Sequence, residues 1–239
     1  MKLLINLPTR GRPERALKLL DLYIENSTHN DIYFIISCDE DDQQMNNLQT
    51  IDEFQKRKNV KVIFNENKIL VNNNGNIEKS NFTTKIAAIN SGVKDQNFDI
   101  CLLASDDMFP EIKGYDSIIV EHMQKYFPDT DGVLWYNDGY QADKLNTLCI
   151  FGKKYYDRFN YIYNPSYLSL YCDNEFTEVS KILNKVIYID QIIIRHNHWS
   201  INNNEKSFKK DKIDEKNDIF AGYDQMIFEQ RKLNGFYLK

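Results

Sequence analysis

The sequence of 239 residues lacks long hydrophobic runs and closely spaced cysteines. No stretch approaches the ~18 apolar residues of a membrane-spanning helix. The five-residue run before Pro8 is too short for a signal peptide. The cysteines form no CxxC pair and no zinc-ligand spacing; they are Cys38, Cys101, Cys149 and Cys172. We therefore expect a cytoplasmic protein with reduced thiols and no membrane span.

The sequence also lacks a large excess of charge of either sign. It has 30 Lys and Arg against 35 Asp and Glu, a net charge of −5, and so gives no strong signal for nucleic-acid binding. Hydrophobic residues make up 42% and charged residues 27%, as in ordinary globular proteins. With no internal repeat and no clear linker, residues 1–239 are expected to form a single domain.

The first 110 residues alternate between strand and helix patterns. This alternation predicts an α/β protein with a mainly parallel, Rossmann-like central sheet flanked by helices. The second half predicts a smaller mixed sheet, and its polar stretch 203–218 predicts a mobile loop before a closing helix. The expected strands are 2–8, 31–41, 59–66, 98–107, 131–137 and two pieces within 185–199; the expected helices are 12–27, 81–95, 114–128 and 224–233.

Polar side chains follow three of the predicted strands. Thr9 and Arg10 follow the first, residues 39–42 end the second, and residues 105–107 end the fourth. Because ligands bind beyond the carboxyl ends of parallel strands, we expect these clusters to converge on one edge of the sheet.

The pair Asp106 and Asp107 ends a strongly apolar strand. Aspartates also cap helices and begin turns, and Pro110 follows shortly, so a purely structural role stays open. Two neighbouring carboxylates repel each other unless a cation joins them. Oxygen ligands of this kind suit Mg²⁺ or Mn²⁺ together with substrate phosphates. The pair therefore predicts a divalent-metal site for a diphosphate.

Two histidines, His196 and His198, end the last apolar run and share one face of an extended segment. A histidine in a strand can be structural, but imidazole also binds Mn²⁺. One of the two is thus a candidate ligand of metal or phosphate, and the choice between them stays open.

A third cluster comprises Asp173, Glu175 and Glu178 at the start of a predicted helix. Acids are stabilised there by the helix dipole. However, a tyrosine-rich apolar approach precedes them, and a carboxylate flanked by aromatic side chains can have a raised pKa and accept a proton from a substrate hydroxyl. Asp173 and Glu175 are the candidate bases.

The order of these motifs resembles that of the GT-A fold glycosyltransferases, particularly the inverting family 2 type. The resemblance covers roughly residues 1–200. It implies transfer of a sugar from a nucleotide diphosphate sugar to a hydroxyl, with inversion and with Mn²⁺ or Mg²⁺. One departure is Ser105, which stands where the family's metal motif begins with aspartate.

The resemblance also implies roles for individual residues. Asp39 would hydrogen-bond the nucleobase and favour a UDP-sugar. Asp107 would bind the metal together with Asp106 and His198. Asp173 would be the catalytic base that accepts the proton of the acceptor hydroxyl. The nucleotide-binding set would comprise Thr9, Arg10, Arg12, Asp39, Asp41, Lys85, Asn90, Ser105 and Asp106. Residues 1–110 would form the nucleotide-binding half and 111–200 the acceptor half. In the remainder, 201–239, the lysine-rich segment 206–212 either contacts phosphate or is only a solvated run of charge.

Two other functions share such a fold. A nucleotidyltransferase that makes sugar nucleotides would normally have a glycine-rich phosphate loop after the first strand, where this sequence has only Gly11. A non-catalytic nucleotide-sugar-binding protein would lose the base, and the acids after the tyrosine-rich approach argue against it. The acceptor stays open between a saccharide, a lipid, a protein side chain and a modified base.

Overall fold

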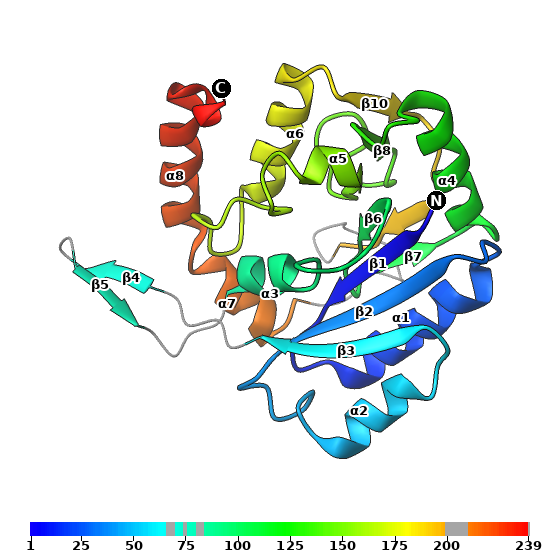
Figure 1. Ribbon diagram of the computed structural model, residues 1–239. Helices are drawn as coiled ribbons and strands as arrows, with labels where there is room; N and C mark the ends of the chain where they lie inside the picture. Colours follow the sequence, from blue (N-terminus) through cyan, green and yellow to red (C-terminus); the bar gives the residue numbers. More distant parts are fainter. Residues whose placement is uncertain (66–69, 74–75, 80–83, 199–209, 239) are drawn as a thin grey trace.

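The computed structural model describes residues 1–65, 70–73, 76–79, 84–198 and 210–238, and its centre is a seven-stranded sheet (Figure 1). The strand order is β10-β8-β9-β6-β1-β2-β3, and every pairing is parallel except those of β9, which is antiparallel to both neighbours. The predicted α/β class with a mainly parallel sheet is confirmed. The strands are β1 (Leu3–Pro8), β2 (Ile32–Asp39), β3 (Val60–Asn65), β6 (Ile100–Leu103), β8 (Val133–Tyr136), β9 (Ile150–Gly152) and β10 (Val186–Ile189).

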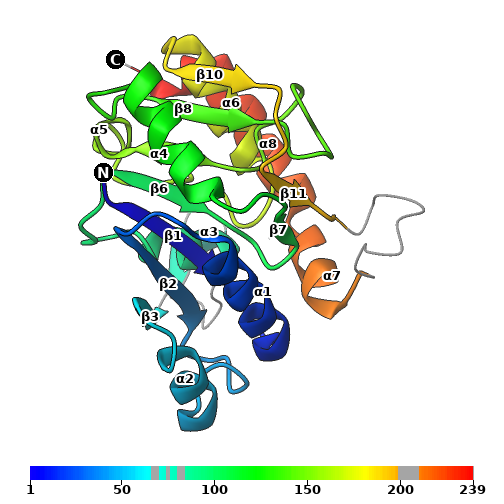
Figure 2. The same cartoon turned by 90° about the vertical axis from the view of Figure 1, so that its right-hand side faces the viewer.

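Helices cover both faces of this sheet, because its strands are apolar on both sides. Leu3, Ile5 and Leu7 of β1 belong to one core cluster, whereas Leu4 belongs to the other. Figure 2 shows α1 and α4 in front of the sheet, and α6 and α8 behind it. The first cluster contains residues of α1 (Pro13–Asn26), α2 (Leu48–Gln55) and α4 (Tyr115–Tyr126); the second contains residues of α3 (Lys85–Ser91), α5 (Lys153–Tyr156) and α6 (Cys172–Ile182).

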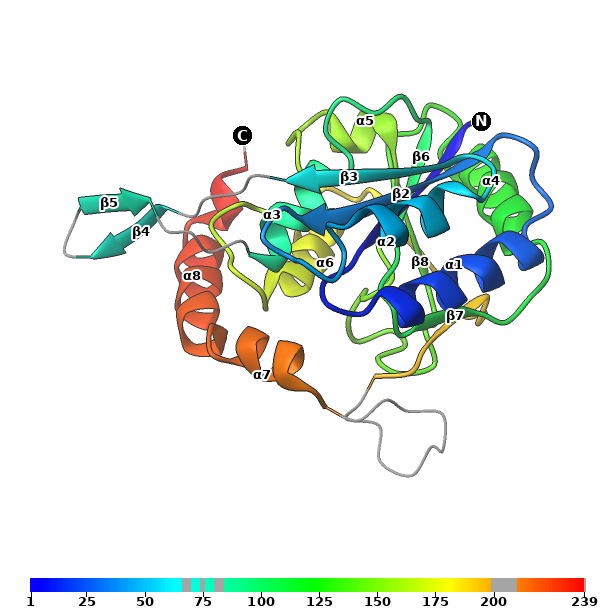
Figure 3. The same ribbon diagram turned by 90° about the horizontal axis from the view of Figure 1, so that it is seen from below.

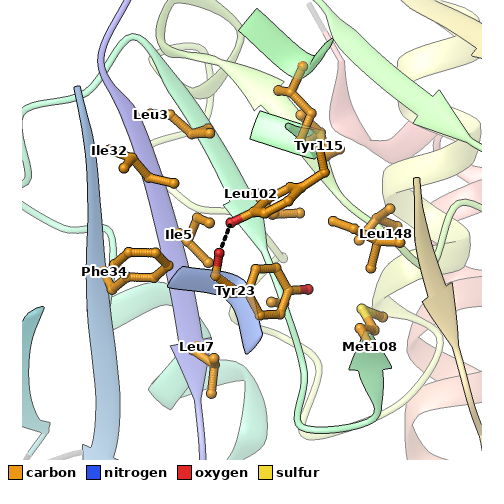
Figure 4. Packing of buried hydrophobic residues seen from close by; sticks show 14 of the residues in the cluster. Leu3, Ile5, Leu7, Tyr23, Ile32, Phe34, Leu102, Met108, Tyr115 and Leu148 are labelled. Carbon is orange, nitrogen blue, oxygen red and sulfur yellow. Dashed lines mark hydrogen bonds between the residues drawn. The ribbon is translucent and has the colours of Figure 1, made fainter. Parts of the chain in front are cut away.

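A tyrosine pair joins α1 to α4 within the first cluster (Figure 4). The rings of Tyr23 and Tyr115 meet edge to face, with centroids 5.3 Å apart. The Tyr115 hydroxyl donates to the Tyr23 carbonyl oxygen at 3.2 Å, so a buried polar group is satisfied inside the core.

Two small antiparallel pairs accompany the main sheet. Strand β7 (Met108–Pro110), directly after the acidic pair, pairs with β11 (Ile194–His196), which sets His196 opposite Met108. Strands β4 (Leu70–Asn73) and β5 (Asn76–Lys79) pair with each other and extend to one side of the sheet (Figure 3).

The C-terminal part differs from the prediction of a loop over 203–218. Residues Lys212–Asp218 form helix α7, and helix α8 (Ala221–Leu233) begins three residues before the expected 224, followed by a short 3₁₀ turn (Gly235–Tyr237). Asp211 and Asp214 bind Arg12, a tertiary contact that hydrophobic periodicity does not reveal. Residues 203–209, with most of the lysine-rich segment, lie outside the described residues. No helix in the described ranges is both long enough and apolar enough to cross a membrane.

Candidate functional site

A cavity of about 350 Å³ lies at the carboxyl ends of β1, β2 and β6, where ligands bind in sheets of this type. Its size is in the range of small-molecule sites. Most of the predicted site residues line it. They are Thr9, Arg10, Arg12, Asp39, Lys85, Ser105, Asp106, Asp107, Asp173, His196 and His198, whereas Asp41, Asn90 and Glu175 are not among the lining residues.

Asp39 is fixed at the end of β2 by two side chains. Arg10 donates from Nη1 to its Oδ2 at 2.8 Å, and Asn65 donates from Nδ2 to its Oδ1 at 3.3 Å. Asp41 binds the same guanidinium through two hydrogen bonds of 2.6 and 2.8 Å. Asp41 therefore holds Arg10, while Thr9, Arg10 and Asp39 face the cavity.

Asp106 is buried and bound by two arginines. Arg12 lies 3.3 Å from its carboxylate, and Arg15, which the sequence did not single out, lies 3.2 Å from it. Burial raises the pKa of Asp106, although the charges of both arginines oppose this shift. Arg12 also binds Asp211 and Asp214 before α7 and in its first turn. The Asp106 carboxylate thus has two cationic partners from the chain itself.

Asp107 has different partners. The Ser105 hydroxyl donates to its Oδ1, and His196 Nε2 lies 3.4 Å from its Oδ2. Burial alone would raise the pKa of Asp107, but the hydrogen bonds from His196 and Ser105 outweigh burial and hold the pKa below the ordinary range. The carboxylate is therefore ionised at the cavity wall.

Asp138 is a site-supporting residue that the sequence analysis missed. His196 lies between Asp107 and Asp138, and its Nδ1 is 3.6 Å from Asp138 Oδ2. Burial disfavours the imidazolium, but the two carboxylates outweigh burial and raise the pKa of His196 to about 9. The rule that polar residues after an apolar strand lie at the ligand-binding edge, which identified Asp39, also applies to Asp138. Strand β8 is apolar, and Asn137 and Asp138 follow it directly.

His198 stacks on Tyr140 with ring centroids 5.1 Å apart, and burial lowers its pKa, which favours the neutral imidazole that binds metals. Among the described residues, no group of three or more His, Cys, Asp or Glu side chains is placed to hold a metal ion. The predicted set Asp106, Asp107 and His198 is therefore not assembled by the protein alone. Asp107 and the neutral His198 nevertheless fit a site that diphosphate oxygens complete, as is usual for Mg²⁺ sites, whereas His196 is protonated.

Asp173 lies at the start of α6 and lines the cavity. The residue that caps this helix, Tyr171, has a left-handed backbone with φ of 59°, which is uncommon for a non-glycine residue. Burial raises the pKa of Asp173, and the nearby charge of Lys85, at the start of α3, opposes the shift. The structure thus brings Lys85 and Asp173 together at one wall.

Glu175 and Asn90 have other partners. Glu175 is buried and accepts hydrogen bonds from Arg231 and from the Tyr167 hydroxyl. Asn90 donates to the Tyr163 carbonyl oxygen at 2.7 Å and accepts from the Tyr163 N–H at 3.1 Å. Asn90 therefore holds a loop whose Tyr163 lines the cavity, instead of facing the ligand space itself.

No protein-family model matches the sequence, and a comparison with curated proteins finds no match. The structure does match solved proteins. S. aureus TarS superimposes with a TM-score of 0.61 and 13% identity over 82% of this chain. A mannosyltransferase from Pyrobaculum calidifontis, solved with GDP-Man and Mn²⁺, gives 0.60 with 8% identity over 83%.

A Drosophila β-1,4-galactosyltransferase 7 variant, solved with manganese, UDP-Gal and xylobiose, matches 90% of this chain with a TM-score of 0.50 and 12% identity. This chain has a GT-A fold. At this level of identity the likeness concerns the fold alone. The GT-A chain spans 36% of the TarS chain and 60% of its fragment 1–349, which has been solved with UDP.

Proposed function

We propose that this GT-A chain is a glycosyltransferase that moves a sugar from a nucleotide diphosphate sugar, with a UDP-sugar favoured, to an acceptor hydroxyl. The observation that carries the proposal is that Asp39, Asp107 and Asp173 line one cavity at the carboxyl end of the sheet. These three carboxylates come from separate parts of the chain. Asp39 would hydrogen-bond the nucleobase, Asp107 would bind the metal and Asp173 would accept the proton.

The donor would lie along the cavity with its base near Asp39 and its diphosphate near Asp107. Residues 1–110 would supply the base contacts, while Arg10, Arg12 and Lys85 would supply positive charge toward the phosphates. The complexes of TarS with UDP and UDP-GlcNAc support a uridine donor. The acceptor would bind to the acceptor half of the chain, residues 111–200.

The reaction would be a single displacement with inversion. Asp173 would accept the proton of the acceptor hydroxyl while the hydroxyl oxygen forms its bond to the anomeric carbon. On the opposite face the bond between this carbon and the diphosphate oxygen would break. The burial of Asp173 supports its role as the base, because burial raises its pKa and a carboxylate with a higher pKa is a stronger proton acceptor.

A divalent ion, Mn²⁺ or Mg²⁺, would be held by Asp107 with His198, whereas the protonated His196 would orient Asp107. When bound, the ion would neutralise the charge that grows on the leaving diphosphate. Asp106 is better suited to position Arg12 and Arg15, to which it is bound. Ser105 would orient Asp107 through its hydrogen bond to Oδ1.

Thermal-shift screening with UDP-, GDP- and ADP-sugars, each with and without Mn²⁺, tests the proposal, because a bound donor raises the melting temperature by mass action. Donor hydrolysis is then measured for the stabilising nucleotide sugars. Metal-dependent release of nucleoside diphosphate is expected. Binding without any turnover would favour the non-catalytic alternative, and release of pyrophosphate from a nucleoside triphosphate and a sugar phosphate would favour a nucleotidyltransferase.

A further inference from the structure

The cavity wall beside Asp173 is held by a side chain of the C-terminal helix. Asp224 of α8 is fully buried. Its carboxylate accepts hydrogen bonds from three successive backbone N–H groups, those of Leu168, Ser169 and Leu170, each at 2.8 Å. We call residues 168–170 the wall loop, because Ser169 and Leu170 line the cavity. One carboxylate from a distant helix therefore fixes the backbone of this loop.

The wall loop leads directly into the start of α6. Tyr171 has a left-handed backbone with φ of 59°, and Cys172 Sγ donates to the Ser169 carbonyl oxygen at 3.7 Å. A non-glycine residue keeps such a conformation only where its surroundings impose it. In the described part of the chain, no side chain donates a hydrogen bond to the Asp173 carboxylate, which accepts from the Asn174 N–H at 3.0 Å. The position of Asp173 therefore depends on the backbone that precedes it.

We propose that Asp224 is a positioning residue for glycosyl transfer, which holds the wall loop so that Asp173 and the adjoining cavity surface meet the acceptor in a productive geometry. This inference rests on the proposed function, because it takes Asp173 as the base. A base must lie within hydrogen-bond reach of the hydroxyl whose proton it accepts. The effect of Asp224 thus falls on the chemical step. Donor binding relies on Asp39 and Asp107, which other segments carry.

A second loop of the cavity is held in the same way. Asp138 Oδ1 accepts hydrogen bonds from the N–H groups of Tyr140, Gln141 and Ala142 at 2.7–3.1 Å, and Tyr140 and Gln141 line the cavity. Both loops belong to the acceptor half, residues 111–200. Loops that are fixed before a substrate arrives need less ordering when it binds, so the two carboxylates preorganise this half of the cavity.

Asp224 offers a cleaner test than Asp138. Asp138 lies beside His196, which contacts the candidate metal ligand Asp107. Asp224 lies outside the cavity lining, so its replacement leaves the groups that face the ligand space unaltered.

Asp116 of α4 is a matched control. It is also fully buried, and its carboxylate accepts hydrogen bonds from the N–H groups of Thr28 and His29 at 2.8–3.0 Å. These residues lie outside the cavity lining. Asp116→Ala therefore removes a comparable buried carboxylate from a loop that has no part in the site.

Hydrogen exchange tests the structural step without any substrate. The wall-loop amides should exchange at least about tenfold faster in Asp224→Ala than in the native protein, because their acceptor is lost. Asp116→Ala should leave the exchange of these amides unchanged. Native exchange rates for the wall loop in Asp224→Ala overturn the inference.

Steady-state hydrolysis of the UDP-, GDP- and ADP-sugars of the thermal-shift screen, with Mn²⁺ and with water as the acceptor, tests the effect on catalysis. For the sugar nucleotide that turns over, Asp224→Ala should lower kcat by about 10- to 100-fold, the usual cost of a small misplacement. The KM of the donor and the Kd of the nucleoside diphosphate should stay within about twofold, the pattern expected when an interaction of the transition state alone is lost.

The controls separate positioning from stability. Asp116→Ala should keep the native kcat and KM at a temperature where it is folded. Asp224→Asn retains one acceptor oxygen, so its kcat should lie between those of the native protein and Asp224→Ala, and it carries the test if the alanine variant does not fold. A native kcat in the Asp224 variants, or an equal loss in Asp116→Ala, overturns this inference alone. A native protein that hydrolyses none of the donors overturns the proposed function, and the inference with it.

Discussion

Arg231 of α8 donates two hydrogen bonds to Glu175 of α6, from Nε to Oε2 at 2.7 Å and from Nη2 to Oε1 at 2.9 Å. The Glu175 side chain is buried and the Arg231 side chain is partly buried. Residues two positions apart on a helix point to different sides, so Asp173 lines the cavity while Glu175 ties α6 to α8. This relationship separates a candidate base from a structural carboxylate in the same short motif.

Asp173→Asn should lower sugar transfer by about 10²- to 10⁴-fold, the usual contribution of a general base. Donor affinity should change little, because asparagine keeps the size of the side chain. Glu175→Gln is the matched control and should instead destabilise the fold by about 1–3 kcal/mol, since the partly buried Arg231 loses its ionic partner. Transfer rates at saturating donor test Asp173→Asn, and chemical denaturation measures the stability of Glu175→Gln. Full activity in Asp173→Asn would refute its role as base.

Asp107→Asn should abolish the Mn²⁺-dependent part of UDP binding, because the variant removes the ionised carboxylate at the cavity wall. Asp106→Asn should keep this metal dependence and lower stability by about 1–3 kcal/mol, since Arg12 and Arg15 lose a charged partner. Calorimetric titration with and without Mn²⁺ distinguishes the two. If Asp107→Asn still binds UDP more tightly with Mn²⁺ than without it, Asp107 is not a metal ligand.

The rate of transfer should fall on the acid side at a pH above the ordinary aspartate range. Asp173 must be ionised to accept a proton, and burial raises its pKa. Acid therefore protonates it earlier than an exposed aspartate, whose pKa is about 3.9. A pH–rate profile measures this limb. The same limb in the residual activity of Asp173→Asn would assign it to another group.

Asp131 should contribute acid-sensitive stability. Its ion pairs with Arg158 and Lys185 hold its pKa at about 2. Since the folded pKa is below the unfolded value of about 3.9, this stability is present above pH ~4 and is lost as the pH falls toward ~2. Partial exposure of both cations limits it to about 1 kcal/mol. Denaturation of Asp131→Asn from pH 7 to pH 2 should show a weaker pH dependence than the native protein.

UDP should bind at least about tenfold more tightly than ADP, because the uracil ring N–H can donate to Asp39 and the adenine ring has no N–H. UDP should also bind more tightly than GDP, whose larger guanine ring carries an equivalent N–H and therefore tests the size of the base site. Asp39→Ala should lose most of this preference while it retains affinity for the diphosphate. Titration of the three diphosphates into both proteins is the measurement. Equal affinities in the native protein would contradict the assignment of Asp39.

The sequence predicted the class of fold because strand and helix periodicities are local. Apolar runs placed β1, β2, β3 and β6, and the rule for carboxyl ends placed Asp39, Asp106 and Asp107 on one edge. The same local signals failed for α7, which has few buried apolar residues and is held by charged contacts to Arg12.

The partners of each carboxylate depended on the tertiary structure. Asp106 and Asp107 are adjacent in sequence, yet Asp106 is bound by Arg12 and Arg15 and Asp107 by His196, which is 89 residues away. Likewise Asp173 and Glu175 are equivalent acids in a sequence, and only the packing of α8 on α6 gives Glu175 its arginine. The sequence by itself determined which residues reach the edge of the sheet. Only the folded chain decided which of them are already paired, because the pairing side chains come from segments far apart in the sequence.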